Sequence, residues 1–278
     1  MSNGITFWGV RGSVAAPGPS TAGVGGNTTC SEVSLGQERI LVDGGTGLRA
    51  LGAAWGPRPM KAAILFSHLH WDHIQGVPFF GPLYHPQSSF LLVGPEGLRA
   101  ALQAQMSRPS FPVGMEVMAG RLEFREIAAG DRFELGAVSV ATAALNHPGG
   151  AIAYRLEHEG LALVHALDHE HGDREADQRL LELARGAELL VYDGQYLPEE
   201  YPAKAGWGHS TYEQGVELAR RAGVRRLALA HHDPLRTDRE VAGIEARARR
   251  RFAGAVAACE GRPLALFRAS RSPRLKAS

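Results

Sequence analysis

The chain has 278 residues, of which 44% are hydrophobic, and its 30 lysine and arginine residues against 29 aspartate and glutamate residues give a formal net charge of +1. This balance excludes a global basic field that would draw the protein onto nucleic acid or an anionic membrane. The length suits one large α/β domain, and we expect a single domain over residues 1–278.

The two cysteines, Cys30 and Cys259, are far apart in the sequence and form no CxxC pair. This spacing indicates neither a disulfide framework nor a thiolate zinc site. The first residues, MSNG, do not begin a signal peptide, and no stretch approaches the roughly 18 apolar residues of a membrane helix. We therefore expect a cytoplasmic protein without a membrane partner.

The first part of the chain contains short apolar runs that are typical of strands. We expect strands at residues 4–10, 29–35, 39–43, 62–67 and 90–93, a Gly/Pro loop at 11–26, and helices at 47–55 and 97–106. The segment 107–117, SRPSFPVGMEV, contains two prolines and is expected to be a loop. A lid over a site is one use that the sequence leaves open for it.

The second part alternates strands and helices. We expect strands at 138–144, 151–157, 161–166, 188–192, 225–230 and 264–268. A helix at 173–185 begins at Asp173 as N-cap, another begins at the capping box Ser210–Glu213 and ends at Gly223, and a last one spans 239–252. Two β-rich halves, each with helices, predict an α/β (α+β) fold built as a four-layer αββα sandwich.

The segment FSHLHWDHIQG, residues 66–76, places three histidines and an aspartate directly after an apolar strand. Residues two apart at a strand end point to the same side, so His68 and His70 can face one metal ion. If the chain then turns into a helix, Asp72 and His73 face away from that pair and can hold a second ion. The spacing therefore predicts two metals.

The remaining ligands are expected at other strand ends, where a rigid scaffold presents them to a shared cleft. His147, Asp168 and His231 each follow an apolar run by a few residues or less. A single histidine at a strand end is usually solvated or a hydrogen-bonding residue. Four such strand ends together favour a metal centre.

These motifs resemble those of a known family. HLHWDH matches the HxHxDH signature of the metallo-β-lactamase superfamily, and His147, Asp168 and His231 follow in the order of its later ligands. A bacterial subgroup of metal-dependent hydrolases, related to phosphodiesterases and ribonuclease Z, is similar in further segments: FWGVRGSVAAPGP, GGNTTC, LDHEH, YDGQY, GWGHSTYEQ and HHDP. The resemblance covers nearly the whole chain and implies the metallo-β-lactamase fold.

The resemblance also implies how the ligands divide. One ion would be held by His68, His70 and His147, the other by Asp72, His73 and His231, with Asp168 bridging them. Two divalent ions are the expected cofactors, with zinc favoured and manganese or iron left open. His232 competes with its neighbour His231; we place His231 in the site because it directly follows the strand, and His232 behind it.

Other residues are assigned around this centre. The histidine of the HST motif in ribonuclease Z-like enzymes protonates the leaving group, so His209 in GHST and the ligand Asp72 are the expected catalytic residues. Asp193 is expected to orient a ligand histidine or His209 from behind. Arg11 is a candidate phosphate contact, with a plain exposed turn as the alternative, and His171, at a position that the subgroup shares, is a candidate substrate contact.

The leading hypothesis for function is a phosphodiesterase that uses a hydroxide shared by two ions on a small phosphodiester such as a cyclic nucleotide. A ribonuclease Z-like tRNA 3′ endonuclease is an alternative, but no lysine-rich arm is present, so nucleic acid is not the expected partner. A thioester or lactone hydrolase is a further alternative. So is a di-iron redox or sensor protein, which typically has a carboxylate where His70 stands. The natural substrate and a homodimer are left open.

Overall fold

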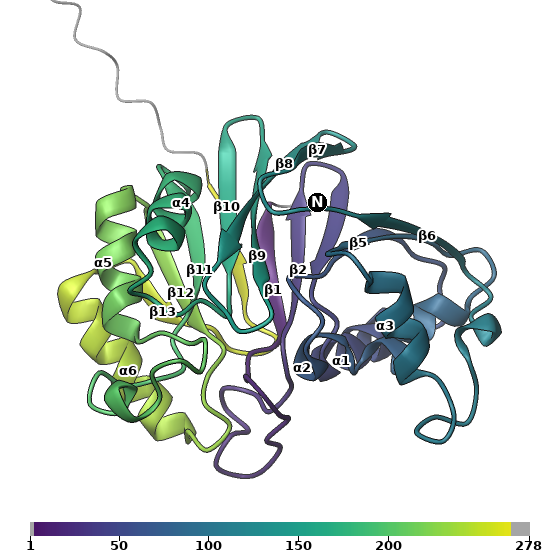
Figure 1. Cartoon of the computed structure of the whole chain (residues 1–278), viewed down its shortest axis with the longest axis horizontal. Coiled ribbons are helices and arrows are strands. Elements are labelled where there is room, and N and C mark those ends of the chain that lie inside the picture. Colours follow the sequence, from purple (N-terminus) through teal and green to yellow (C-terminus); the bar gives the residue numbers. More distant parts are fainter. Residues whose placement is uncertain (1–2, 268–278) are drawn as a thin grey trace, which may run out of the picture.

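The structure is a computed structural model of the chain, and it describes residues 3–267. Two seven-stranded sheets pack face to face, and helices cover the outer face of each (Figure 1). The expected four-layer αββα sandwich is confirmed. Across residues 3–267, no helix has the length and apolar character that a membrane span requires.

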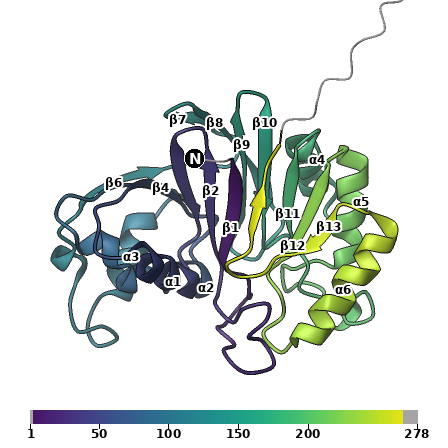
Figure 2. The same ribbon diagram turned by 180° about the vertical axis from the view of Figure 1, so that it is seen from behind.

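The first sheet has the strand order β14-β1-β2-β3-β4-β5-β6. Strands β3 to β6 run parallel, whereas β14, β1, β2 and β3 pair antiparallel. Figure 2 shows β1 beside β14, the last strand described. The strands are β1 (Gly4–Gly9), β2 (Cys30–Leu35), β3 (Glu38–Val42), β4 (Lys61–Leu65), β5 (Ser89–Gly94), β6 (Arg121–Glu126) and β14 (Pro263–Ala265). Its helices are α1 (Thr46–Trp55), α2 (Trp71–Ile74) and α3 (Leu98–Gln105), with short 3-10 turns at Val77–Phe79, Gly81–Tyr84 and Met115–Val117.

The second sheet has the order β13-β12-β11-β10-β9-β8-β7. Strands β10 to β13 are parallel, and β7 to β10 are antiparallel. The strands are β7 (Arg132–Leu135), β8 (Val138–Leu145), β9 (Ala151–His158), β10 (Leu161–Ala166), β11 (Leu189–Asp193), β12 (Arg226–Ala230) and β13 (Ala255–Ala257). The helices are α4 (Arg174–Ala184), α5 (Tyr212–Ala222) and α6 (Asp238–Arg251), and a 3-10 turn spans Tyr201–Ala203.

The core lies in three layers that follow the alternation of side chains along each strand. Ile40 and Val42 of β3 point into the layer between the two sheets, whereas Leu41 points into the layer under the helices of the first sheet. Both faces of the central strands are therefore buried, which explains why Lys61–Leu65 reads as an almost continuous apolar run.

Helix ends agree with the sequence in part. The Asp173 side chain accepts a hydrogen bond from the Ala176 N–H and caps α4, and Gly223 ends α5 in the left-handed conformation at φ 65°. The expected cap at Ser210 is wrong: Thr211 caps α5, because the Ser210 hydroxyl is engaged by Tyr192. The complete capping box belongs to α6, between Thr237 and Glu240.

Three strands were not expected from the sequence. β6 and β7 lie at sheet edges, where exposed charged residues alternate with buried or partly buried apolar ones, so neither contains the continuous apolar run of a central strand. β13 has only three residues. The last expected strand is shorter than predicted, because β14 ends at Ala265; Arg268 lies outside the described residues.

Candidate metal centre and active site

The carboxyl ends of strands from both sheets meet at one edge of the sandwich. The HLHWDH segment follows β4, Asp168 follows β10, and His231 follows β12. His147 follows β8, which runs in the same direction as β10 because each pairs antiparallel with β9. Strand direction alone therefore delivers these side chains to a common point.

The structure brings the expected ligands together in two triplets. His68, His70 and His147 form one, and Asp72, His73 and His231 form the other; within each triplet the candidate ligand atoms lie within 4.8 Å of one another. The His70 Nδ1 and His147 Nε2 atoms are 3.0 Å apart. His70 is the N-cap of the short helix α2, whereas Asp72 and His73 lie within it, so this segment supplies both triplets.

Asp168 lies between the triplets. Its Oδ1 atom is 3.6 Å from His147 Nε2 and 3.9 Å from His68 Nε2. Its Oδ2 atom is 3.1 Å from His73 Nε2 and 3.2 Å from His231 Nε2. One carboxylate oxygen thus faces each triplet, which is the arrangement that a bridging ligand requires.

Several of these atoms lack a hydrogen-bond partner. Among the described residues, His68 Nε2, His73 Nε2 and Asp168 Oδ2 are buried and make no hydrogen bond, although His73 and Asp168 are close enough for an ion pair. Buried polar atoms without a partner are costly and rare in folded proteins. Imidazole nitrogens and carboxylates are the ligands that zinc-class ions prefer, so the residues present fit a metal centre.

Asp43 and Ser67, which were not identified from the sequence, contact the Nδ1 atom of His73. The Asp43 Oδ2 atom is 2.9 Å from His73 Nδ1, and the Ser67 hydroxyl donates to Asp43 and lies 3.1 Å from His68 Nδ1. A carboxylate behind a histidine fixes the ring and directs its other nitrogen to the metal. Asp43 had the same signal as Asp168, since it directly follows an apolar strand.

The rings of His147 and His231 are also held from behind, in each case by a carbonyl oxygen. The Gly208 carbonyl lies 2.9 Å from His147 Nδ1, and Gln195 Oε1 lies 2.8 Å from His231 Nδ1. Gly208 has φ 87°, and a Cβ atom there would be 2.1 Å from His147 Nδ1, so only glycine fits this contact. No sequence pattern distinguished Gln195 beforehand.

Left-handed backbone conformations are concentrated here. Of the five described non-glycine residues with positive φ, Ser13, Asp43, Asp168 and His231 belong to this region, with φ between 59° and 63°. The backbone N–H of Ser13 donates to Asp72 Oδ2 at 2.8 Å. The loop at 11–26 therefore reaches the centre through its backbone.

His209 and Asp193 lie beside the cluster. The His209 Nδ1 atom is 2.9 Å from Asp193 Oδ2 and 3.8 Å from Asp168 Oδ1. Its ring stacks on His231 with a centroid distance of 4.9 Å. Asp193 also accepts a hydrogen bond from the backbone N–H of Asp168 at 3.1 Å, so one carboxylate orients His209 and anchors Asp168.

Burial and neighbouring carboxylates shift the pKa values of three histidines in the cluster. Burial lowers the pKa of His68 well below its ordinary value. At His231 burial acts in the same direction, but the carboxylates of Asp168 and Asp72 outweigh it and raise the pKa to about 9. At His73 burial is likewise outweighed, chiefly by Asp168 and Asp72, and the pKa lies well above its ordinary value. Cation binding at His73 and His231 would therefore compete with protonation of the two rings.

His171 and His232 are two further histidines that belong to neither triplet. His171 Nδ1 is 3.0 Å from the hydroxyl of Ser210, the residue after His209, and its ring contacts Tyr201 at a centroid distance of 4.3 Å. His232 was expected behind His231, but its contacts are structural: its Nε2 lies 3.1 Å from the Ala258 carbonyl, and its backbone pairs with Val10 and Gly12.

Arg11 is not placed to contact a substrate. Its side chain is fully buried, and its guanidinium donates to the backbone carbonyls of Gly25, Asp233 and Arg236. The expected phosphate contact is therefore corrected to a structural one: Arg11 ties the loop at 11–26 to the segment after β12.

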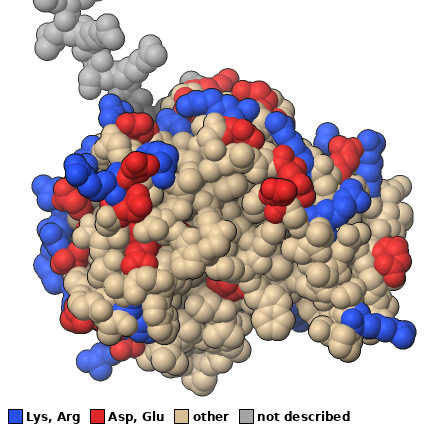
Figure 3. Space-filling model, in the orientation of Figure 1, with Lys and Arg blue, Asp and Glu red and all other residues tan. Residues whose placement is uncertain are grey.

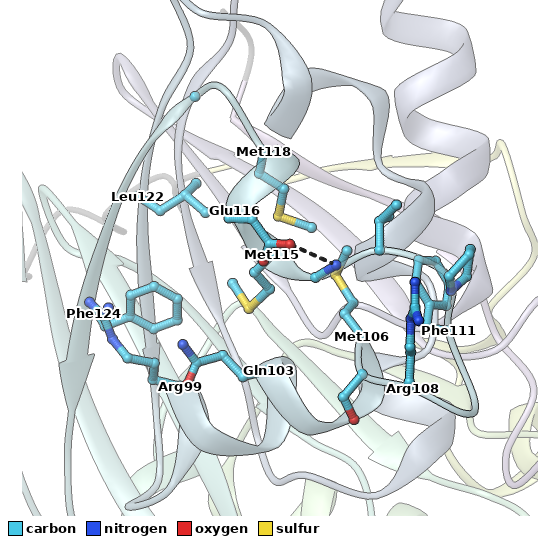
Figure 4. Close-up of a pocket in the computed structure, with 15 residues that line it drawn as sticks. Arg99, Gln103, Met106, Arg108, Phe111, Met115, Glu116, Met118, Leu122 and Phe124 are labelled. Carbon is cyan, nitrogen blue, oxygen red and sulfur yellow. Dashed lines mark hydrogen bonds between the residues drawn. The ribbon is translucent and has the colours of Figure 1, made fainter.

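The segment 107–117 builds a separate cavity. With α3 and β6 it surrounds a space of about 840 Å³, around which Figure 4 shows Met106, Met115 and Met118. Phe111 of this segment contacts Phe79 at a centroid distance of 5.8 Å. The residues around this cavity include none of the ligand cluster, so the segment does not act as a lid in this conformation.

Comparison with known proteins agrees with the geometry. A family model described as "Beta-lactamase superfamily domain" matches residues 38–232. Ribonuclease Z of Exiguobacterium sibiricum is 28% identical over 238 residues, covering 70% of this chain and 79% of the relative.

Solved structures show the same fold at low sequence identity. The metallo-β-lactamase fold protein YhfI from Bacillus subtilis has a TM-score of 0.72 at 18% identity, covering 94% of this chain and 98% of that one. A diphosphatase from the PhnP family has a TM-score of 0.70 at 18% identity, covering 95% and 97%.

Proposed function

Because the chain belongs to the β-lactamase superfamily, we propose that it is a metal-dependent hydrolase, and more narrowly a phosphodiesterase that cleaves a small phosphodiester such as a cyclic nucleotide. The position of Asp168 carries this proposal, since one of its oxygens faces each ligand triplet. Such a carboxylate supports two neighbouring ions, and centres of this kind serve hydrolysis of phosphate esters.

Bound divalent ions would lower the pKa of the attacking water and neutralise charge that develops on the phosphoryl oxygens. The chain's own groups position the reactants. Asp72, which Ser13 holds through its backbone N–H, is proposed to accept a proton from the attacking water. Asp43 and Gln195 keep the rings of His73 and His231 aligned from behind.

His209 is proposed to protonate the leaving oxygen. Its Nδ1 is held by Asp193, which leaves Nε2 for the substrate, and the carboxylate stabilises the protonated ring. The stacked ring of His231 restricts its rotation. His171, linked to the next residue through the Ser210 hydroxyl, is proposed to contact the substrate at the edge of the same site.

A turnover panel on metal-loaded protein tests this function. Bis(p-nitrophenyl) phosphate, a cyclic nucleotide, a thioester and a lactone are compared at equal enzyme concentration. We expect hydrolysis of a phosphodiester with a kcat/KM at least about tenfold above those for the thioester and the lactone. Efficient thioester or lactone cleavage without phosphodiester cleavage would overturn the assignment in favour of those alternatives.

A ribonuclease Z-like endonuclease is the second candidate, because the ribonuclease Z relative aligns along most of both chains. The expectation that nucleic acid is not a partner is therefore not supported. On the face drawn in Figure 3, basic and acidic side chains are interspersed. The net charge of +1 also gives no global basic field, which favours a small substrate. A precursor tRNA with a 3′ trailer decides between the two: specific cleavage at physiological salt would favour the endonuclease.

A further inference from the structure

A cavity of about 560 Å³ opens directly beside the first ligand triplet. His68 and His70 form one wall, so the cavity is continuous with the candidate active site. Much of the remaining lining is apolar and includes Ile127, Ala128 and Ile152. This cavity shares no residue with the one between α3 and β6.

The cavity is built on rigid parts of the fold. The backbone N–H of Ile152, at the start of β9, donates to the Ser67 carbonyl at 2.9 Å, next to His68. The backbone N–H of Ile127, just after β6, donates to the Gly94 carbonyl at the end of β5 at 2.9 Å. The two isoleucines are therefore held at fixed positions relative to the ligand histidines. A ligand that enters finds a preformed site.

The charges around the cavity restrict what it can bind. Apart from the two histidines, Glu96 is the one ionisable residue among those described around it, and Glu96 is exposed. No lysine or arginine of the described chain lines the cavity to pair with a second phosphate or carboxylate group. An anionic substituent of the substrate would lose its hydration and lie near the Glu96 carboxylate, and both effects oppose binding. Burial of an apolar substituent is favourable, because it removes apolar surface from water.

We propose that this cavity binds an uncharged, apolar arm of the substrate, alkyl or aryl, while the reacting group lies at the ligand cluster. The proposal rests on the proposed function and narrows its substrate class. It favours a phosphodiester with a hydrophobic substituent over polyanionic substrates such as RNA.

Phosphonates with a single organic group test the cavity, because they have one arm and no bond to cleave. Binding of phenylphosphonate, methylphosphonate and phosphonoacetate to the metal-loaded full chain is measured by calorimetry. We expect phenylphosphonate to bind at least about tenfold more tightly than methylphosphonate, since burial of a few apolar carbons in a pocket gives discrimination of this order. Phosphonoacetate, with its anionic arm, is expected to gain nothing over methylphosphonate.

Ala128→Phe fills the cavity from an exposed position. It is expected to weaken phenylphosphonate binding about tenfold and to leave methylphosphonate binding unchanged. Ala246→Phe, at an exposed position on α6, is the matched control and should change neither. In a second variant, Glu96→Lys, the affinity for phosphonoacetate should rise relative to methylphosphonate.

The outcomes separate the two proposals. Equal affinities for the phenyl and methyl compounds, or an equal loss of both in Ala128→Phe, would overturn the cavity assignment and leave the hydrolase assignment standing. If no phosphonate binds, the turnover panel alone decides the phosphodiesterase assignment. The cavity is then tested by hydrolysis of acetyl and benzoyl thioesters, where an absent benzoyl preference, or one that Ala128→Phe does not reduce, overturns it as well.

Discussion

Asp168 combines burial, an unusual backbone conformation and a backbone hydrogen bond. It is buried, its φ of 60° lies in a region that non-glycine residues seldom adopt, and its backbone N–H is tied to Asp193. Strained conformations of this kind cost roughly 1–3 kcal/mol and persist where the surroundings enforce them. Asp43 and His231 share the conformation, so backbone strain marks the same residues as the metal-binding geometry.

The first prediction concerns Asp168→Ala. If this carboxylate bridges two ions, its loss should reduce bound metal below two equivalents per chain and lower kcat/KM by more than about 100-fold, since losing even an outer partner of a ligand costs 10–100-fold. Metal content after dialysis against metal-buffered solution, together with turnover, measures both effects. Asp177→Ala, which removes the contact to His169 outside the cluster, is the control and should keep its metal. Two retained equivalents and full activity in Asp168→Ala would disprove the bridge.

His209→Ala supplies the second prediction. A lost proton donor should lower kcat by roughly 10²–10⁴-fold for a substrate with a poor leaving group, such as a cyclic nucleotide. The loss should be smaller for a p-nitrophenyl ester, because p-nitrophenolate leaves without protonation. Metal content should stay at the wild-type value, since His209 is not assigned as a ligand. A loss of equal size for both substrates would contradict the role in protonation.

A third prediction addresses the residue behind His209. Asp193→Asn keeps the size of the side chain but removes the charge that holds His209 Nδ1 and stabilises its protonated form. The kcat loss should again be larger for a cyclic nucleotide than for a p-nitrophenyl ester, because only the former needs a proton on its leaving oxygen. A purely structural role would lower kcat by the same factor for both substrates.

At the scale of elements, strand direction explains why the sequence could group the candidate ligands into one site. His147, Asp168 and His231 each follow an apolar strand, so polar residues at the ends of parallel strands were enough to propose a shared site. The groups behind the ligands were not predictable in the same way. Gly208 contributes a carbonyl and Ser13 a backbone N–H, contacts that depend on loop conformation and that no residue type reveals.

Arg11 shows that residue type and loop composition can also suggest a wrong role. A cation in a glycine-rich loop suggested a phosphate contact, but the backbone carbonyls around it need donors, and the guanidinium satisfies three of them inside the protein. The edge strands β6 and β7 were missed because each alternates charged and apolar residues over only four to six positions, and the prediction relied on continuous apolar runs.

The loop before α5 supplies the fourth prediction. The Glu170 carboxylate accepts hydrogen bonds from the backbone N–H groups of Gly206 and Gly208 and from the Tyr201 hydroxyl. Glu170→Ala should therefore lower the free energy of unfolding by about 2–4 kcal/mol, because hydrogen bonds to buried charged groups contribute roughly 1.5–3 kcal/mol each and do not add fully. Urea denaturation measures the change. Glu175→Ala, which breaks an exposed pair with Arg179, should have no measurable effect and serves as the control.

At the scale of the whole molecule, the centre joins the two halves of the sandwich. The HLHWDH segment belongs to the first sheet, whereas His147, Asp168 and His231 belong to the second. Any ion bound by both groups therefore links the sheets at their common edge. Among the described residues, His68 Nε2, His73 Nε2 and Asp168 Oδ2 of this centre are buried without hydrogen-bond partners. We therefore expect metal binding and global stability to be coupled.

The last prediction follows from this coupling. Removal of metal by a chelator should lower the Tm, because a ligand at 100 times its Kd stabilises the native state by about 2.7 kcal/mol. For a chain of this size we expect a decrease of about 5 °C or more, measured by calorimetry and reversed by added zinc. The Asp168→Ala variant is the internal control: having lost its bridge, it should respond less to the chelator. An unchanged Tm in the chelated wild-type protein, with metal loss verified, would show that the two sheets hold together independently of the centre.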